Sequence, residues 1–390
     1  MVVRERDPGE MHSVPEPSVR ADGLLDAWKR VRGYVAFVVL AILIVYWWLT
    51  MVSFASPYDW GFDFRQFWQG GNDVVNGVSP YPTAEQLADA RTKFGPTAIQ
   101  EDFRFVYPAG AAVALAPLGA LDFDLAAAIW GLFLIGAILG SLLVLGVRDW
   151  RVFAIVASSH PVITSVRLGT FTPVLLLLAA CAWRWRDNRW VAGGALAVAL
   201  SFKLFLWPLG VWLLATRRYA AAALGSVLAA AFTFGAWAAI GFEGMRVYPD
   251  LLRQLEALVD EIGLSFVALG VRSGLPDAVA NVLPFVVGIP LLVAVVVVAR
   301  RPDGDRRAFS IAVVAAIAIT PIVWLHYFTL LVAPLAVLRP RLAWPWAIMT
   351  VFWLVPSQGN EGRLSRIVIP FALTAVIAMM CARRPPRAAV

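Results

Sequence analysis

The residues that could do chemistry are a few ionisable side chains set in strongly apolar surroundings. Asp63 lies in FDFRQFW, Lys203 in AVALSFKLFLW and His326 in TPIVWLHYFTLL. Charges are costly inside a bilayer, so ionisable residues in such segments are candidates for a functional site. A carboxylate could take a proton from an acceptor hydroxyl, while cations could hold a phosphate. The combination predicts chemistry on a phosphate-bearing lipid.

Other ionisable residues are expected to join this group, and each member also has a structural interpretation. Arg104 and Arg167 could be ordinary surface charges, and His160, which precedes a proline, is expected to be structural. Lys203 could reach water from a helix end, and Asp63 could cap a helix. The joint occurrence of an acid, a histidine and several cations favours a site more strongly than any single residue does.

The sequence contains none of the common motifs for soluble nucleotides or catalytic metals. There is no phosphate-binding glycine loop, no dinucleotide-binding fingerprint and no HExxH. The acidic pairs Asp122/Asp124 and Asp303/Asp305 do not stand in a context typical of a metal site. The two cysteines fall in or beside apolar segments, without metal-ligand spacing. We therefore expect neither a metal nor a cofactor.

The elements that must position these residues are membrane helices. Of the 390 residues, 60% are hydrophobic and 15% are charged, so lipid must cover part of the apolar surface. An all-α polytopic bundle of about 10 to 13 transmembrane helices is predicted. Long runs at 34–54, 123–147, 219–241 and 277–299 can each span a bilayer. Shorter runs come in pairs, at 151–166 with 170–184, 190–202 with 203–215, 308–325 with 326–338, and 342–356 with 367–382.

The basic residues orient this bundle. The net charge is +7, and its Arg clusters lie between apolar runs, which is typical of cytoplasmic loops rather than of a nucleic-acid surface. If each run crosses once, all dense clusters fall on one side, at 148–151, 184–189, 217–218, 300–307, 339–341 and 383–387. We expect a disordered cytoplasmic tail at 1–32, a membrane domain at 33–382 and a cytoplasmic tail at 383–390. No cleavable signal peptide is indicated.

Two long segments then lie on the outer side, at about 55–105 and 242–276. The second contains an amphipathic stretch over 248–261, which is expected to lie on the membrane surface as a helix. The short run at 106–120 contains two prolines and is interpreted as a re-entrant or interfacial segment. With this topology, the candidate residues all reach one outer water–lipid boundary.

The order of these landmarks resembles a known family. DFRQFWQGGNDVVNGVSPYP begins with Asp63, and FVYPAGAAVALAPLGAL, RLGTFTPVLLLLAA, LSFKLF and TPIVWLHYFTLL follow in that order. Together they resemble the GT-C membrane glycosyltransferases, specifically glycosyltransferase family 87. That family includes actinobacterial polyprenol-phosphate-mannose-dependent α-mannosyltransferases.

The resemblance implies a reaction and roles for individual residues. A sugar, expected to be mannose, would pass from a polyprenyl-phosphate donor to a cell-envelope glycolipid or glycan at the extracytoplasmic face, with inversion. Asp63 would be the general base, and Lys203 with Arg104, Arg167 and His326 would bind the donor phosphate. Sugar or acceptor contacts would come from three aromatic residues, Trp68, Tyr107 and Trp324.

The chain also departs from the family pattern, which leaves alternatives open. Gly169-Thr170 stands where Gly-Gln is common, Tyr107-Pro108-Ala109 replaces Tyr-Pro-Pro, and only Ser265 remains of an Asn-Gln-Ser sequence. These changes affect the sugar and the acceptor more than the transfer chemistry. One alternative is an arabinofuranosyl or other lipid-linked-sugar transferase. Another is a transporter or flippase of lipid-linked sugars, which would carry its ionisable groups near the bilayer midplane.

Overall fold

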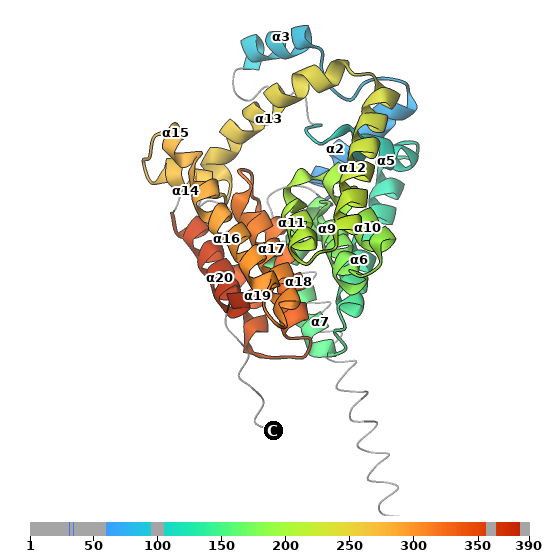
Figure 1. Ribbon diagram of the computed structural model, residues 1–390. Helices are drawn as coiled ribbons and strands as arrows, with labels where there is room; N and C mark the ends of the chain where they lie inside the picture. The colour runs from blue at the N-terminus through green and yellow to red at the C-terminus, as the bar shows by residue number, and fades with distance from the viewer. Residues whose placement is uncertain (1–30, 32–33, 35–59, 95–104, 356–363, 383–390) are drawn as a thin grey trace, which may run out of the picture. The chain divides into compact units, whose positions relative to one another are not determined.

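A computed structural model describes residues 31, 34, 60–94, 105–355 and 364–382. The chain divides into two compact units, Met1–Leu49 and Thr50–Val390, and the elements below belong to the second. Within the described residues every regular element is a helix, which confirms the predicted all-α class (Figure 1). The α-helices are α2 Phe62–Val75, α3 Ala84–Phe94, α5 Ala109–Gly119, α6 Phe123–Val144, α7 Trp150–Ala157, α8 His160–Leu168, α9 Thr172–Arg184, α10 Arg189–Phe202, α11 Pro208–Ala215, α12 Tyr219–Ile240, α13 Glu243–Ile262, α14 Phe266–Arg272, α15 Asp277–Ala280, α16 Leu283–Ala299, α17 Gly304–Ile319, α18 Val332–Leu338, α19 Ala347–Val351 and α20 Leu364–Ala382. The 3₁₀ helices are η2 Leu204–Leu206, η3 Leu325–Leu331, η4 Trp344–Trp346 and η5 Phe352–Leu354.

Three helical segments of the described chain are long and apolar enough to cross a membrane: Phe123–Val144, Tyr219–Ile240 and Asp277–Ala299. They match three of the four long runs predicted from hydropathy. The fourth, at 34–54, lies outside the described residues. Large apolar side chains on these helices face outward, with Leu132 71% exposed and Val227 65% exposed. Side chains of this kind require lipid around them, so the chain is an integral membrane protein.

The shorter apolar runs fold as helices interrupted near their middle. α8 and α9 are bent by 116° at a break that begins at Gly169, and this pair is a fourth candidate span. α10 ends at Phe202 and is separated from η2 by Lys203 alone, and α17 ends at Ile319, before η3. The run at 151–166 differs from the prediction because it contains two helices, α7 and α8. Pro161 in the first turn of α8 explains this break: it has no backbone N–H, and its ring would clash with the carbonyl of Ala157 four residues earlier, so α7 cannot continue through it.

The segment at 106–120 contains one helix, α5, of 11 residues. A helix of this length extends about 16 Å, roughly half the thickness of the hydrocarbon core. It packs closely on α2, since a Cβ added to Gly119 would collide with the Asn72 backbone nitrogen. The helix is therefore too short to cross the membrane by itself, and the interpretation of the segment as re-entrant or interfacial stays a prediction.

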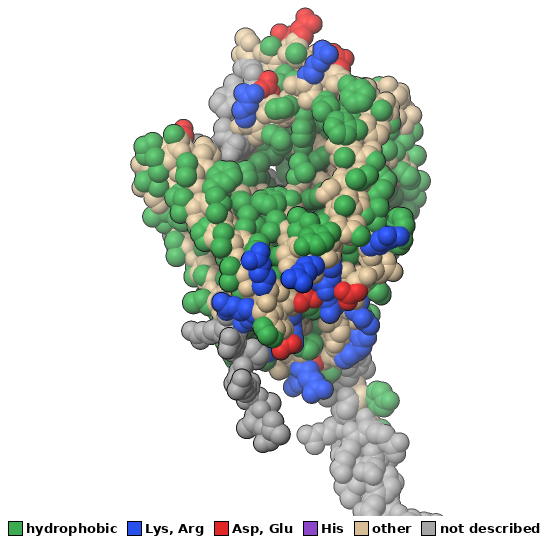
Figure 2. All heavy atoms as spheres, viewed as in Figure 1, with side chains coloured by type: hydrophobic (Ala, Val, Ile, Leu, Met, Phe, Trp, Pro, Cys, Tyr) green, Lys and Arg blue, Asp and Glu red, His purple; other side chains and the backbone are tan. Residues whose placement is uncertain are grey.

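The amphipathic stretch predicted at 248–261 is part of α13, which extends over Glu243–Ile262. Its first half packs on an aromatic cluster in which the ring of Tyr81 lies 4.7 Å from that of Trp237 and 5.8 Å from that of Tyr248. Figure 1 shows α2, α3 and α13 toward the upper end of the view. The space-filling view shows a hollow beneath the region of α13 (Figure 2).

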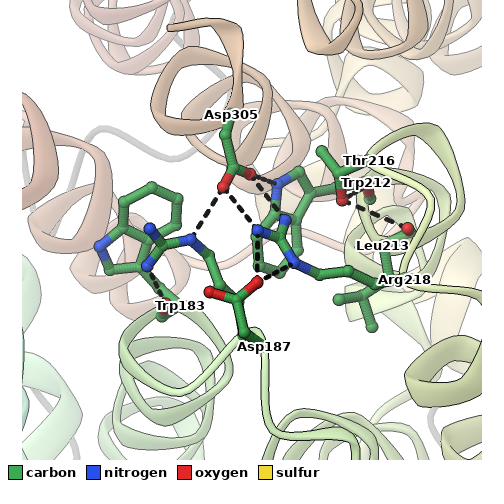
Figure 3. Close-up of polar contacts among 8 residues, drawn as sticks. Trp183, Asp187, Trp212, Leu213, Thr216, Arg218 and Asp305 are labelled. Atoms are coloured by element: carbon green, nitrogen blue, oxygen red, sulfur yellow. Dashed lines mark hydrogen bonds and ion pairs between the residues drawn. The ribbon is translucent and has the colours of Figure 1, made fainter.

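Lys and Arg side chains gather toward the lower end of the same view (Figure 2). There, Asp305 at the start of α17 accepts hydrogen bonds from Arg186 Nε at 2.8 Å, Arg218 Nη1 at 3.0 Å and Trp212 Nε1 at 2.8 Å (Figure 3). Arg218 Nε also donates to Asp187 at 2.9 Å. These contacts bring three of the predicted basic loops together, at 184–189, 217–218 and 300–307.

We expect Asp305→Asn to lower the stability of the folded protein by about 2 kcal/mol. The substitution keeps the shape of the side chain but removes the charge that two guanidinium groups share. Breaking a fully buried ion pair costs about 3–5 kcal/mol, and the 29% exposure of Asp305 reduces this effect. The melting temperature in detergent measures the change.

Asp303→Asn is the matched control for this measurement, because it makes the same substitution two residues away on an exposed side chain. Asn tolerates the left-handed backbone at this position, where φ is 56°. Its effect is expected to stay within about 0.5 kcal/mol. Equal melting temperatures for the two variants would show that Asp305 does not hold these loops together.

Candidate active site

Asp63 lies in the first turn of α2, and the start of this helix is fixed by the turn between α8 and α9. Gly61 adopts a left-handed backbone, with φ 73°, and is the N-cap residue, so the alternative role of Asp63 as the cap is wrong. The Gly61 backbone N–H donates to the Arg167 carbonyl oxygen at 2.8 Å. Arg167, a predicted phosphate ligand, therefore lies at the helix end that anchors α2.

The side chain next to Asp63 is locked in place. Phe64 is 1% exposed, and its ring stacks on Trp130 with centroids 5.8 Å apart. Trp130 in turn donates to the Gly169 carbonyl oxygen at 2.8 Å. A Cβ at Gly169 would lie 2.6 Å from the Phe64 Cβ, and Gly169 has a φ of 75°, so only glycine fits this turn. The Gly-centred turn predicted from the sequence thus positions Asp63.

Lys203 lies at the break between α10 and η2, where its backbone is extended. Its Nζ donates to the Tyr327 hydroxyl at 2.7 Å and lies 5.1 Å from the centroid of the Tyr107 ring. Lys203 and Asp63 interact electrostatically, and the Asp63 charge also acts on Tyr107 and Tyr327. Four distant parts of the sequence thus meet at one place.

Asp63 is half-buried, and the protein atoms around its carboxylate exclude water from it. This loss of hydration is the largest influence on the pKa of the carboxylate. Burial raises the pKa of Asp63 from its ordinary value of 3.8 to about 6, and the Lys203 charge offsets part of that rise. Within residues 60–94, 105–355 and 364–382, no side-chain or backbone group donates a hydrogen bond to this carboxylate. The oxygens are therefore open to a ligand hydroxyl.

His326 lies on η3, and its side chain is 3% exposed. Its Nε2 atom is buried and has no hydrogen-bond partner within the described structure. Its carbonyl oxygen is 3.4 Å from Ser165 Oγ, which also shares a 2.9 Å hydrogen bond with Thr329 Oγ1. The lysine charge acts on the His326 ring, so the two predicted phosphate ligands are electrostatic neighbours.

The aromatic candidates differ in their placement. Tyr107 packs against Phe67 at 4.4 Å and faces Lys203, so it lies beside the central group. Trp68 donates its indole N–H to the Leu121 carbonyl oxygen at 3.0 Å, which uses the polar end of this ring. Trp324 precedes η3 and is half-buried. The remaining candidate, Arg104, falls outside the described residues.

Two polar residues of the site were not predicted from the sequence. Tyr327 follows His326 directly, and it is the hydrogen-bond partner of Lys203. Gln66 lies one turn after Asp63 on α2, and its Oε1 atom is buried without a partner in the described structure. The spacing of Asp63 and Gln66 could have indicated that they share a helix face. Nothing in the spacing of Lys203 and Tyr327 indicated their contact.

His160, in contrast, points to a structural role. Its ring stacks on Trp353 with centroids 4.4 Å apart, and its Nδ1 atom lies 3.3 Å from the Phe352 carbonyl oxygen.

The described residues contain no cluster of three or more His, Cys, Asp or Glu side chains that could hold a metal ion. The group around Asp63 therefore combines one carboxylate, one ammonium and two phenols. This set can accept a proton and bind an anion.

Comparison with known proteins adds the family. The chain matches Glycosyltransferase family 87 over residues 105–323, more than half of its length. This range includes Lys203, whereas Asp63 and His326 lie outside it. No solved structure matches the chain.

Two mycobacterial proteins are similar to the chain, and both are described as a polyprenol-phosphate-mannose-dependent alpha-(1-2)-phosphatidylinositol pentamannoside mannosyltransferase. The protein from Mycolicibacterium smegmatis is 26% identical over 322 residues, which cover 73% of this chain and 74% of the relative. The protein from Mycobacterium tuberculosis is 28% identical over 286 residues, which cover 68% and 61%. With an all-helical membrane fold and a family match over most of that fold, the chain belongs to glycosyltransferase family 87 and is a membrane glycosyltransferase.

Proposed function

We propose that this enzyme transfers mannose from a polyprenyl-phosphate donor to a cell-envelope glycolipid or glycan, with the phosphatidylinositol mannosides as the first acceptor class to test. The observation that carries the proposal is that the helix bearing Asp63 packs through Phe67 on Tyr107, whose ring lies 5.1 Å from Lys203 Nζ. A base and a phosphate-binding cation are thereby brought into one region, as sugar transfer from a phosphate requires. The names of the two mycobacterial relatives support mannose and a lipid-linked donor.

In the proposed mechanism, Asp63 removes the proton from an acceptor hydroxyl while that oxygen attacks the anomeric carbon. The bond between this carbon and the phosphate oxygen breaks, and polyprenyl phosphate leaves with the electron pair. A single displacement turns a β-linked donor into an α-linked product. Lys203 stabilises the negative charge that grows on the phosphate. Arg167, Arg104 and His326 complete the proposed phosphate site.

The membrane supplies the donor to this site. The polyprenyl tail lies in the bilayer, while the sugar phosphate reaches the water–lipid boundary. The Arg clusters gather toward the end of the bundle away from α2, and such clusters face the cytoplasm in membrane proteins. This arrangement supports cytoplasmic termini and a reaction on the extracytoplasmic face.

A transfer assay tests the proposal. The purified protein is incubated with synthetic decaprenyl-phosphate mannose and phosphatidylinositol mannosides, and the products are identified by mass spectrometry. Parallel reactions contain the arabinofuranosyl analogue or a soluble nucleotide sugar. Mannose transfer from the lipid donor alone is the expected result. Transfer of arabinose alone would identify the other donor, and movement of the intact donor across liposomes without transfer would indicate a flippase.

The rate of transfer is expected to fall below a pH of about 6. Asp63 acts as a base only when it is deprotonated, and burial raises its pKa to about 6. Below this value, kcat/KM should fall about tenfold for each pH unit. The measurement is a profile of initial rates between pH 5 and pH 8, taken at subsaturating donor.

The titration of Asp63 would not unfold the protein at low pH, so unfolding through this group does not explain the expected fall in transfer rate. Because its folded pKa is raised, the stability it contributes is fully present below the ordinary value of 3.8 and is lost as the pH rises through about 6. Acid therefore lowers activity while this group favours the folded state. Melting temperatures recorded at each pH are the control, and a flat rate profile between pH 5 and pH 7 would contradict the prediction.

A further inference from the structure

Tyr327 links η3, which carries His326, to η2, which begins directly after Lys203. Its hydroxyl accepts the hydrogen bond from Lys203 Nζ at 2.7 Å, and its ring stacks on Phe205 with centroids 5.0 Å apart and planes 11° from parallel. Phe205 belongs to η2, two residues after Lys203. The tyrosine thus contacts the lysine both through its hydroxyl and through the segment that bears the lysine.

The 3₁₀ geometry of η3 places the side chain of Tyr327 on a different side of the helix from that of its neighbour His326. A 3₁₀ helix has three residues per turn, so residues i and i+3 lie on the same side. His326 and Thr329 therefore share one side, where the His326 carbonyl and the Thr329 hydroxyl contact Ser165 of α8. Tyr327 lies about a third of a turn away and faces Lys203. The Ser165 contacts hold η3 in the rotation that brings the phenol to the lysine.

The Tyr327 hydroxyl is a suitable hydrogen-bond partner for a lysine that must bind an anion. Within the described structure, Lys203 makes no ion pair at 4.0 Å or less, so its hydrogen-bonded anchor is a neutral phenol. At the other end of the bundle, Arg186 and Arg218 are held by the carboxylate of Asp305, which offsets their charge. A phenol oxygen fixes the position of an ammonium without offsetting its charge, and two of the three N–H donors remain for a ligand.

We propose that Tyr327 is a positioning residue that holds the charged Lys203 side chain in place for the phosphate of the lipid donor. The inference rests on the proposed function, because it assigns Lys203 to that phosphate. Tyr327 acts through Lys203 and takes no part in bond making. Its effect falls on binding of the donor and of the polyprenyl phosphate product, and the acceptor side of the site is unaffected.

Tyr327→Phe tests this role, because it removes the hydroxyl and keeps the ring that stacks on Phe205. The affinity for decaprenyl phosphate is measured directly on the purified protein by calorimetry in detergent. We expect the Kd to rise about tenfold, as for loss of one hydrogen bond to a charged group. The KM for the glycolipid acceptor should stay within about twofold of the wild type, which a general loosening of the site would not allow.

Tyr219→Phe is the matched control. It removes the hydroxyl of a tyrosine that is 60% exposed at the start of α12, and it should leave both constants unchanged. An unchanged Kd for decaprenyl phosphate in Tyr327→Phe would overturn the proposal. A lowered melting temperature with a proportional rise in both constants would also overturn it, because it would show a purely structural role.

A double variant separates action through Lys203 from an independent contact. In a Lys203→Met background, adding Tyr327→Phe should change the Kd by less than about twofold. A further tenfold loss would overturn the proposal. The binding assay does not require turnover, so a wild-type protein that binds decaprenyl phosphate but transfers no sugar would reject the proposed reaction and leave the role of Tyr327 to be decided by these Kd values.

Discussion

Asp63→Asn is expected to lower kcat for sugar transfer by about 10²- to 10⁴-fold, the usual contribution of a positioned general base. An amide has nearly the shape of a carboxylate but cannot take the proton of the acceptor hydroxyl. The neighbouring Phe64 remains packed against Gly169 and Trp130, so the geometry of α2 should persist. Initial rates with saturating donor and acceptor measure the effect.

The same substitution at Asp73 provides the control. Asp73 lies on α2 too, where it accepts a hydrogen bond from Gln69 at 2.9 Å. Asp73→Asn should retain transfer within about twofold, since Asp73 lies near the far end of the helix from Asp63. The Kd for decaprenyl phosphate should show that Asp63→Asn still binds the product. Transfer by Asp63→Asn within tenfold of the wild type would rule out Asp63 as the base.

Lys203→Met is expected to lower kcat/KM for the lipid donor by about 10²- to 10³-fold. The substitution keeps a long, flexible side chain but removes the positive charge that stabilises the leaving phosphate. It also removes the cation near Asp63, which raises the pKa of that carboxylate further, because the Lys203 charge normally lowers it. Part of the loss should therefore be recovered at higher pH. Rates at pH 7 and pH 9 measure both effects.

Lys93→Met is the matched control, because Lys93 is exposed on α3 and the substitution removes the same charge from the chain. It should leave kcat/KM within about twofold of the wild type. Lys203→Arg is a second comparison: it keeps the charge with a different shape and should retain more activity than Lys203→Met. If Lys203→Met transferred sugar at the wild-type rate, the donor phosphate would have to bind elsewhere.

The breaks in the membrane helices were predictable because each has a local cause. Gly169 stands between two apolar runs, and its left-handed φ of 75° is a conformation that glycine adopts readily. Lys203 interrupts a run that would otherwise be continuous, and the chain is extended there. The prediction that 151–166 forms one unit was wrong, although Pro161 carried the signal for a second break.

The partners of the charged residues were not predictable in the same way. The hydrogen bond from Lys203 to Tyr327 joins residues 124 positions apart, and the contact of Arg186 with Asp305 joins residues 119 apart. Neither separation follows a helical repeat within one element. Asp305 drew attention in the sequence only as part of an unconvincing metal motif, and the structure shows it holding three loops together.

The sequence by itself determined that this chain is a polytopic helical membrane protein, which residues interrupt its helices, and which family it resembles. The first two properties follow from the length of apolar runs against a bilayer of fixed thickness, and from single residues with strong backbone preferences. The family resemblance rests instead on the order of the motifs that begins with Asp63 and ends with the segment around His326. Only the tertiary structure decided that Asp63 is fixed by the Gly169 turn and that a neutral tyrosine holds Lys203. Those contacts depend on how helices from distant parts of the chain pack, and side-chain packing leaves no periodic signal in the sequence.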